Sequence, residues 1–191
     1  MHNMDDIETE EILTCLRITA HHPLHEIKNV FKLINFNKKE KHLAEDALKI
    51  GRDTKSCRIS LYDQRVSRVQ FSIRAFRHFN SSQLFFEIQN LSRRGKLIVN
   101  NIALEYLNKV ELPKKALVRF AEFQFLVEKE DGESTENFET FFELARAPCQ
   151  EVLYVPSMSP VPETGLLINA CSIPPYCSSQ TPVEMEECEL K

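Results

Sequence analysis

The sequence predicts an all-β protein built as an antiparallel β-sandwich, and two observations support this fold class. Apolar and polar residues alternate in several short runs, which is the pattern of strands with one buried face. These runs are rich in aromatic and β-branched residues, and polar stretches separate them, as in sandwiches. No long segment shows the apolar spacing of an amphipathic helix.

The predicted strands extend from Thr14 to about Leu144. Their inward-facing positions are Leu16, Ile18 and Ala20; Cys57, Ile59 and Leu61; Val69, Phe71, Ile73 and Ala75; Leu84, Phe86 and Ile88; Leu97 and Val99; and Phe123, Phe125 and Val127. The opposite, outward face of the third run carries Arg68, Gln70, Ser72 and Arg74. Asn100-Asn101 predicts a tight turn, because Asn tolerates the left-handed region. The acidic stretch 129–139 is predicted to hold a helical turn.

Composition divides the chain into three parts. Residues 1–13 form an acidic arm that is poor in core-forming residues, so we expect it to be flexible. Residues 14–147 hold the predicted sandwich domain. Residues 148–191 contain most of the nine prolines of the chain. Such a Pro-rich tail cannot pack into a sheet, and we expect it to be disordered.

Charge and hydropathy exclude several classes of partner. The formal net charge is −4, whereas a general nucleic-acid or anionic-membrane surface needs a basic excess. No apolar run approaches the roughly 20 residues of a membrane helix, and the N-terminus lacks the basic-then-apolar design of a signal peptide. We therefore expect a cytoplasmic protein that binds neither nucleic acid nor membrane and keeps its six cysteines reduced.

Common catalytic and metal-binding motifs are absent from the sequence. There is no GxxxxGK[ST] phosphate loop, HExxH helix, GxSxG elbow or paired-cysteine spacing, so we predict no enzymatic activity, no cofactor and no metal. The cluster of His21, His22 and His25 near Cys15 is compatible with zinc, but a zinc site needs four well-spaced ligands. A surface turn is the better interpretation of this cluster.

Three short segments place polar residues where predicted strands meet loops. They are Gly51-Arg52, Ser67 at the start of the longest run, and Gln89-Asn90 at the end of another. In this order they resemble the forkhead-associated (FHA) domain family, over about residues 14–147. The resemblance implies an FHA-type β-sandwich whose loops bind phosphothreonine. It assigns Arg52 and Ser67 to the phosphate and Asn90 to the ligand backbone.

These residue types suit a phosphothreonine ligand chemically. Phosphothreonine carries about −1.5 to −2 charge and strong acceptor oxygens. A guanidinium group matches a phosphate with two parallel hydrogen bonds, and an Asn amide donates and accepts at once, as a peptide backbone requires.

Two positions depart from the FHA pattern, and a third departs from the FHA-containing adaptor proteins that the whole chain resembles. Gln70 stands in place of a His, Asn101 in place of a Gly, and Gln89 where related adaptors carry a Lys. We keep Gln89 among the predicted phosphothreonine-binding residues. We expect cations of the next loop to take the place of the missing Lys side chain, namely Arg93, Arg94 and Lys96.

The arm and the tail each carry a short motif. Thr9 lies in an acidic context, with Ile12 three positions later as the apolar anchor that FHA ligands often use. Pro182, Glu184 and Glu187 fit the motif Pro-x-Glu-x-x-acidic/aromatic, by which peptides dock onto TRAF-family ubiquitin ligases. Arm, domain and tail together resemble adaptor proteins that combine an FHA domain with TRAF docking.

This resemblance implies a signalling mechanism. An alpha-protein kinase phosphorylates Thr9, and the FHA pocket of a neighbouring homodimer binds it. The resulting higher oligomers gather their tails and activate a TRAF ligase, the sixth member or alternatively the second, for innate immune NF-κB signalling. The alternative is an FHA domain that reads the phosphothreonine of another protein, with Thr9 incidental.

Overall fold

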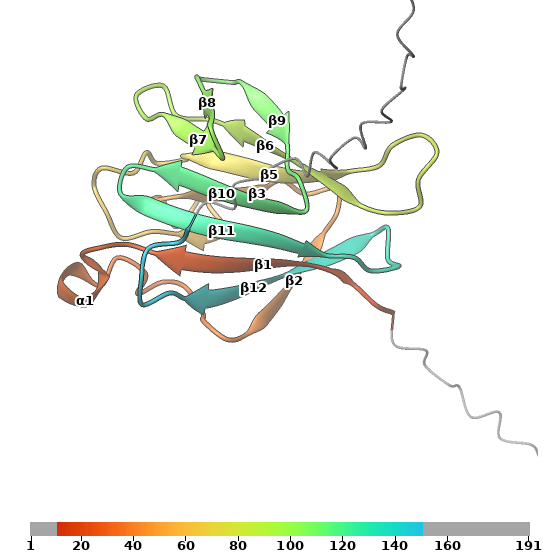
Figure 1. Cartoon of the computed structure of the whole chain (residues 1–191), viewed down its shortest axis with the longest axis horizontal. Helices are drawn as coiled ribbons and strands as arrows, with labels where there is room; N and C mark the ends of the chain where they lie inside the picture. Colours follow the sequence, from red (N-terminus) through yellow and green to blue (C-terminus); the bar gives the residue numbers. More distant parts are fainter. Residues whose placement is uncertain (1–10, 151–191) are drawn as a thin grey trace, which may run out of the picture. The chain divides into compact units, whose positions relative to one another are not determined.

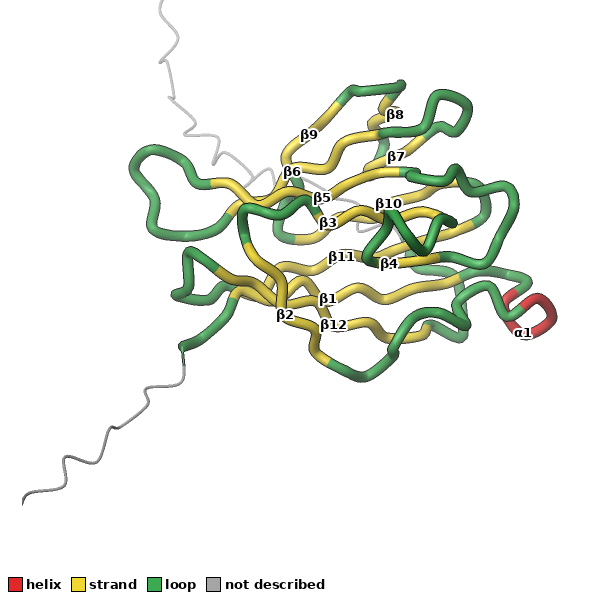
Figure 2. The backbone as a smooth tube through the Cα atoms, turned by 180° about the vertical axis from the view of Figure 1, so that it is seen from behind, coloured by secondary structure: helices red, strands yellow, loops and turns green. Residues whose placement is uncertain are grey.

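The structure is a computed structural model that describes residues 11–150, and within them it is a sandwich of two β-sheets. Figure 1 shows the seven-stranded sheet in front, and Figure 2 shows the five-stranded sheet from behind. Neighbouring strands are antiparallel apart from two parallel pairs, β1 with β12 and β3 with β4. The predicted fold class is confirmed.

Both sheets place strands side by side that are far apart in sequence, such as β1 and β12. The seven-stranded sheet has the order β2 (Lys39–Leu43), β12 (Asn137–Leu144), β1 (Thr14–His21), β11 (Phe123–Glu130), β10 (Lys115–Phe120), β7 (Leu97–Val99) and β8 (Ile102–Leu104). The five-stranded sheet has the order β4 (Ile59–Ser60), β3 (Leu48–Gly51), β5 (Phe71–Phe76), β6 (Phe85–Asn90) and β9 (Lys109–Glu111). One short helix, α1 (His25–Lys28), follows β1. No helix within residues 11–150 is long and apolar enough to span a bilayer.

Phenylalanine rings fill the space between the two sheets. Phe71 of the five-stranded sheet meets Phe120 of the other sheet with ring centroids 5.1 Å apart, and Phe86 meets Phe138 at the same distance. Such edge-to-face pairs contribute about 0.5–1.5 kcal/mol each beyond the burial of their area. Packing of these rings therefore holds the sheets, and the loops at their ends, in one relative position.

Two sequence expectations about local structure are wrong. The stretch 129–139 holds no helical turn: its first two residues end β11, its last three begin β12, and Gly132 lies in the turn between them. A Cβ on Gly132 would lie 2.2 Å from the backbone nitrogen of Thr14. Backbone N–H groups of Glu133 and Ser134 donate to the carbonyl of Ile12. This turn therefore anchors the beginning of the described chain.

Of the four residues expected on the outward face of the run from 68 to 75, only two are exposed. Arg68 and Arg74 are exposed, but Gln70 and Ser72 are buried, and β5 begins at Phe71 rather than at Val69. The predicted turn at Asn100-Asn101 is confirmed. It joins β7 to β8, and Asn100 has a φ of 52°. Cys15, Cys57 and Cys149 are free thiols, whereas the other cysteines lie outside the described residues.

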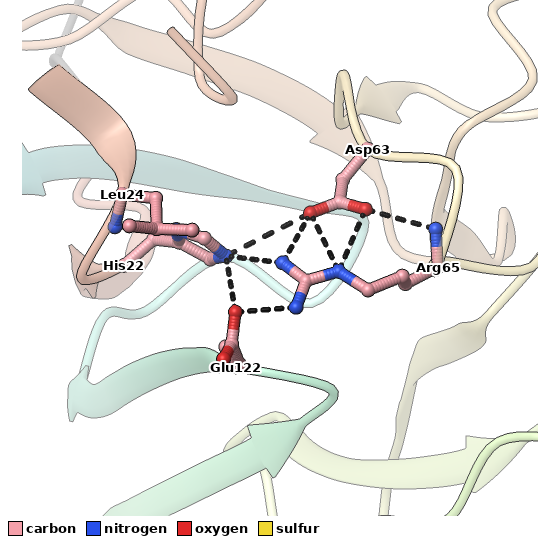
Figure 3. A network of polar contacts seen from close by, with 5 residues as sticks. All are labelled: His22, Leu24, Asp63, Arg65 and Glu122. Atoms are coloured by element: carbon pink, nitrogen blue, oxygen red, sulfur yellow. Dashed lines mark hydrogen bonds and ion pairs between the residues drawn. The ribbon is translucent and has the colours of Figure 1, made fainter. Parts of the chain in front are cut away.

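The histidine cluster lies at the expected turn, Pro23-Leu24, but His21 and His22 are buried there and not at the surface. The side chain of His22 is fully buried, and it lies in a polar network with Asp63, Arg65 and Glu122 (Figure 3). Nδ1 of His22 accepts the backbone N–H of Leu24 at 3.1 Å, so the proton of the neutral ring lies on Nε2. Arg65 pairs with Asp63 at 2.7 Å and with Glu122. The network therefore ties the end of β1 and the turn between β10 and β11 to the loop before Ser67.

This environment lowers the pKa of His22. Burial is the main cause and the Arg65 guanidinium the second, and together they outweigh the two carboxylates, each 3.8 Å from Nε2. A protonated ring would also place an Nδ1–H against the N–H of Leu24. Burial likewise lowers the pKa of His42, whose Nε2 lies 2.8 Å from Oγ1 of Thr140. Both rings are therefore neutral in the folded protein at neutral pH.

We predict that the free energy of unfolding falls as the pH drops below about 6.5, the ordinary histidine pKa. Below that pH the unfolded chain binds protons that the folded protein excludes, so each histidine lowers stability by up to about 1.4 kcal/mol per pH unit. Urea unfolding between pH 7.5 and 5.5 measures this slope. His22→Asn, which keeps an acceptor for Leu24, should flatten it, and a wild-type stability that stays constant over this range would contradict the prediction.

Candidate functional site

A cleft of about 570 Å³ lies where the β3–β4, β4–β5, β6–β7 and β8–β9 loops meet. We call it the arginine cleft, because guanidinium groups and hydroxyls dominate its lining. The polar and aromatic side chains of the lining are Arg52, Arg68, Arg93, Arg94, Ser56, Ser67, Ser92, Asp53 and Tyr106. Two predicted phosphate ligands, Arg52 and Ser67, are therefore brought together from different loops.

Gly51 makes the approach of these two loops possible. The backbone N–H of Arg52 donates to the carbonyl of Ser67 at 3.0 Å, and that of Asp53 donates to the carbonyl of Arg68 at 3.1 Å. A Cβ at position 51 would lie 2.2 Å from the carbonyl oxygen of Arg68, closer than unbonded atoms can come. The glycine of the Gly51-Arg52 pair is therefore needed for close packing.

A hydrogen-bonded chain holds Ser67 in place. Its hydroxyl lies 2.6 Å from that of Ser92, which in turn accepts the backbone N–H of Gly95 at 2.7 Å. The backbone N–H of Ser67 donates to Oε1 of Gln70 at 3.1 Å. Gln70, which stands in place of the family His, thus braces the loop that presents Ser67. Its buried Nε2 has no hydrogen-bond partner among the described residues.

Asn90 lies behind the cleft wall rather than on it. Its side chain is fully buried, and its Nδ2 donates to the carbonyls of Gly95 at 3.0 Å and Leu104 at 2.8 Å. Its Oδ1 accepts the backbone N–H of Ser92. These bonds join the two loops that carry Arg93 and Tyr106. In this conformation Asn90 shapes the cleft, and it has no exposed atom with which to hold a ligand backbone.

Gln89 also lies outside the lining of the arginine cleft. It points to the other side of β6 from Asn90, and its amide donates to the carbonyl of Leu107 at 2.9 Å. The predicted substitute cations Arg93 and Arg94 line the cleft instead, whereas Lys96 does not. The Arg93 guanidinium lies 5.2 Å from the ring centroid of Tyr106. Sequence reasoning missed Tyr106 as a site residue, because no motif marks a lone tyrosine in a loop.

The electrostatics of the cleft favour an anion. Within residues 11–150 no carboxylate forms an ion pair with Arg52, Arg93 or Arg94. The one acidic group of the lining, Asp53, accepts hydrogen bonds from Ser56 Oγ at 2.8 Å and from the backbone N–H of Lys55, which lower its pKa. Four guanidinium groups thus face one carboxylate. Exposed arginines held close together without counter-ions bind phosphate-like groups well.

Metal binding has no comparable support. Residues 11–150 contain no group of three His, Cys, Asp or Glu side chains placed to hold a metal ion. The motif residues of the arm and tail, Thr9, Pro182, Glu184 and Glu187, lie outside the described residues. Ile12 is described, and its side chain is 58% exposed.

Known proteins show a consistent likeness. A family model described as "FHA domain" matches residues 48–121. The "TRAF-interacting protein with FHA domain-containing protein A" of Rattus norvegicus is 43% identical over 100% of both chains. The protein of the same name in Homo sapiens is 44% identical over 99% of this chain and 100% of its own. A solved MEK1 FHA domain is 17% identical with a TM-score of 0.41, and covers 44% of this chain and 72% of that chain.

The family model places the arginine cleft inside an FHA domain, since Arg52, Ser67, Arg93 and Tyr106 all lie within the matched residues. The likeness to the two relatives extends over the arm and the tail as well. The chain therefore belongs to the family of TRAF-interacting proteins with an FHA domain, and it is a phosphopeptide-binding adaptor.

Proposed function

We propose that the arginine cleft reads phosphorylated Thr9 of a neighbouring copy, and that the resulting oligomer recruits and activates a TRAF-family ubiquitin ligase. The observation that supports this most directly is the composition of the cleft. Arg52, Arg93 and Arg94, which form no ion pair within residues 11–150, line the cleft together with Ser67. Charged hydrogen bonds contribute about 1.5–3 kcal/mol each, so two or three of them separate phosphothreonine from threonine.

The length of the chain favours binding between copies over binding within one copy. Ile12 is anchored by Glu133 and Ser134 at the start of β1, on the right in Figure 1. The cleft loops lie toward the other end of β1, where His22 meets Asp63 and Arg65, close to Ser67. The eight residues of β1 span roughly 23 Å, whereas the three residues from Ile12 to Thr9 reach at most about 11 Å.

Such a contact propagates. Each copy offers an arm at one end and a cleft at the other, so a head-to-tail contact is heterologous and extends the assembly instead of closing it. In the proposal the repeating unit is a homodimer, the kinase is an alpha-protein kinase, the protein is cytoplasmic and the output is NF-κB signalling. Clustered tails present many weak motifs to a TRAF ligase, and avidity strengthens binding by about 10²–10⁴.

The alternative is a domain that reads the phosphothreonine of another protein. The same cleft chemistry supports both functions. The two are distinguished by whether phosphorylation of Thr9 changes the oligomeric state.

We predict that a peptide of residues 1–13 phosphorylated on Thr9 binds the protein and that the plain peptide does not compete with it. Arg52→Ala should weaken binding about tenfold to a hundredfold, because it removes a charged hydrogen bond to phosphate. Fluorescence anisotropy measures both. Lys28→Ala, an exposed cation outside the cleft, is the control. Equal affinity for the two peptides would refute the proposed reader.

Assembly is tested by mixing two variants. Phosphorylated Arg52→Ala supplies an arm without a working cleft, and Thr9→Ala supplies a cleft without an acceptor site. Light scattering should show that phosphorylated wild type grows with concentration and that each variant alone keeps its starting size. Mixing the two should restore growth, because a homodimer with two arms alternates with a homodimer with two clefts. Phosphorylated wild type that keeps its starting size would favour the alternative function.

The tail motif has its own test. Glu184→Ala should abolish binding of a peptide of residues 178–191 to the TRAF domain of the sixth TRAF ligase, because the motif requires a glutamate at that place. Glu189→Ala, outside the motif, should leave binding unchanged. Calorimetry measures both affinities, and undiminished binding by Glu184→Ala would eliminate this docking site.

A further inference from the structure

A second depression adjoins the arginine cleft. It has a volume of about 670 Å³ and lies between the end of β2, the outward face of β3 and β5, and the 55–58 loop. We call it the basic groove, after its cationic lining residues Lys41, Lys49, Lys55, Arg58 and Arg74. Ser56 lines both the groove and the cleft, so the two form one continuous surface.

The cations of the basic groove are largely without counter-ions. Within the described residues, Arg58 approaches Glu40 at 3.9 Å, and no ion pair involves Lys41, Lys49 or Arg74. Asp46 is the single carboxylate of the lining. All five cationic side chains are exposed. A concave surface with five cations and one anion attracts a ligand that carries several negative charges.

The remaining polar groups of the groove are poor candidates for catalysis. His42 lies close to Thr140, and its pKa is lowered by burial and by Arg58, so it adds no charge at neutral pH. The thiol of Cys57 donates to the carbonyl of Arg68 at 3.2 Å, and burial raises its pKa. A thiol with a raised pKa is a weak nucleophile. The surface is therefore suited to binding an anion.

We infer that the basic groove is a second subsite for the same phosphopeptide and binds the carboxylates that precede Thr9 in the arm of a neighbouring copy. This inference rests on the proposed function. The arm carries Asp5, Asp6 and Glu8 ahead of Thr9 and has no lysine or arginine. An extended peptide rises about 3.3 Å per residue, so these side chains lie within roughly 13 Å of the phosphothreonine, a span that suits two depressions sharing Ser56.

The acidic residues after Thr9 are less suited to this role. Glu10 and Glu11 connect Thr9 to Ile12, which the donor's own domain holds. Those residues must bridge the gap between the two domains. The residues before Thr9 have no such constraint, and they are the ones free to lie along the surface of the acceptor. The cleft thus detects the phosphate, and the groove selects an acidic sequence beside it.

The test compares two phosphopeptides on three proteins by fluorescence anisotropy. Both peptides comprise residues 1–13 with phosphorylated Thr9, and in one of them Asp5, Asp6 and Glu8 are replaced by Asn, Asn and Gln. The proteins are wild type, the groove variant Lys49→Thr/Arg74→Thr, and the control Lys28→Thr/Arg146→Thr. The control removes the same charge from exposed positions outside both depressions.

Neutralising the peptide should weaken binding to wild type and to the control by about three- to tenfold, as several exposed ion pairs would. The groove variant keeps Lys41, Lys55 and Arg58, so it should bind the acidic phosphopeptide less tightly than wild type does and lose less affinity when that peptide is neutralised. Equal affinity of wild type for the two phosphopeptides overturns the groove inference, and so does a neutralisation effect that is as large in the groove variant as in the control. Failure of wild type to prefer phosphorylated over plain peptide is a different result, which overturns the proposed reader itself.

Discussion

The contact between the segment at Gly51 and the segment at Ser67 is the constraint on which the site depends. Two backbone hydrogen bonds, from Arg52 to Ser67 and from Asp53 to Arg68, hold the β3–β4 loop against the β4–β5 loop. The absence of a side chain on Gly51 permits this spacing. Any Cβ there would force the loops apart, at a cost of about 1–3 kcal/mol typical of overpacking. Arg52 and Ser67 would then no longer face one ligand.

The polar side chains of the site fall into two sets, those that hydrogen-bond within the protein and those that remain available for a ligand. Gln70, Asn90 and Ser92 form hydrogen bonds with the backbone and with neighbouring side chains. These bonds hold the wall of the arginine cleft together. Arg52 and Arg94 make no ion pair within residues 11–150 and remain available for an anion. The wall therefore does not have to rearrange when a phosphate binds, and the ordering cost falls on the exposed arginine side chains. The adjoining basic groove adds further cations, most of which form no ion pair within the described residues, along the path proposed for the ligand.

Much of the fold was predictable from alternation alone. The runs that contain Ile18, Phe86 and Phe125 are strands as predicted, since a half-buried strand must alternate. The pattern failed for β2, whose sequence KEKHL lies at the edge of a sheet and has little to bury. It also failed in the stretch 129–139, where composition suggested a helical turn. There the packing of Gly132 against Thr14 requires a tight turn between two long strands.

For the site, the sequence by itself determined the residue types that can bind phosphate and their order along the chain, because charge and hydrogen-bonding capacity belong to each side chain alone. The resemblance to FHA domains points to Arg52 and Ser67, and charge in the next loop points to Arg93 and Arg94. The structure places all four around one cleft. Only the tertiary structure decided that Asn90 and Gln89 lie off the cleft surface and that Tyr106 lies on it. The direction of a side chain depends on which face of a strand packs inward and on which loops meet, and those contacts join residues far apart in sequence.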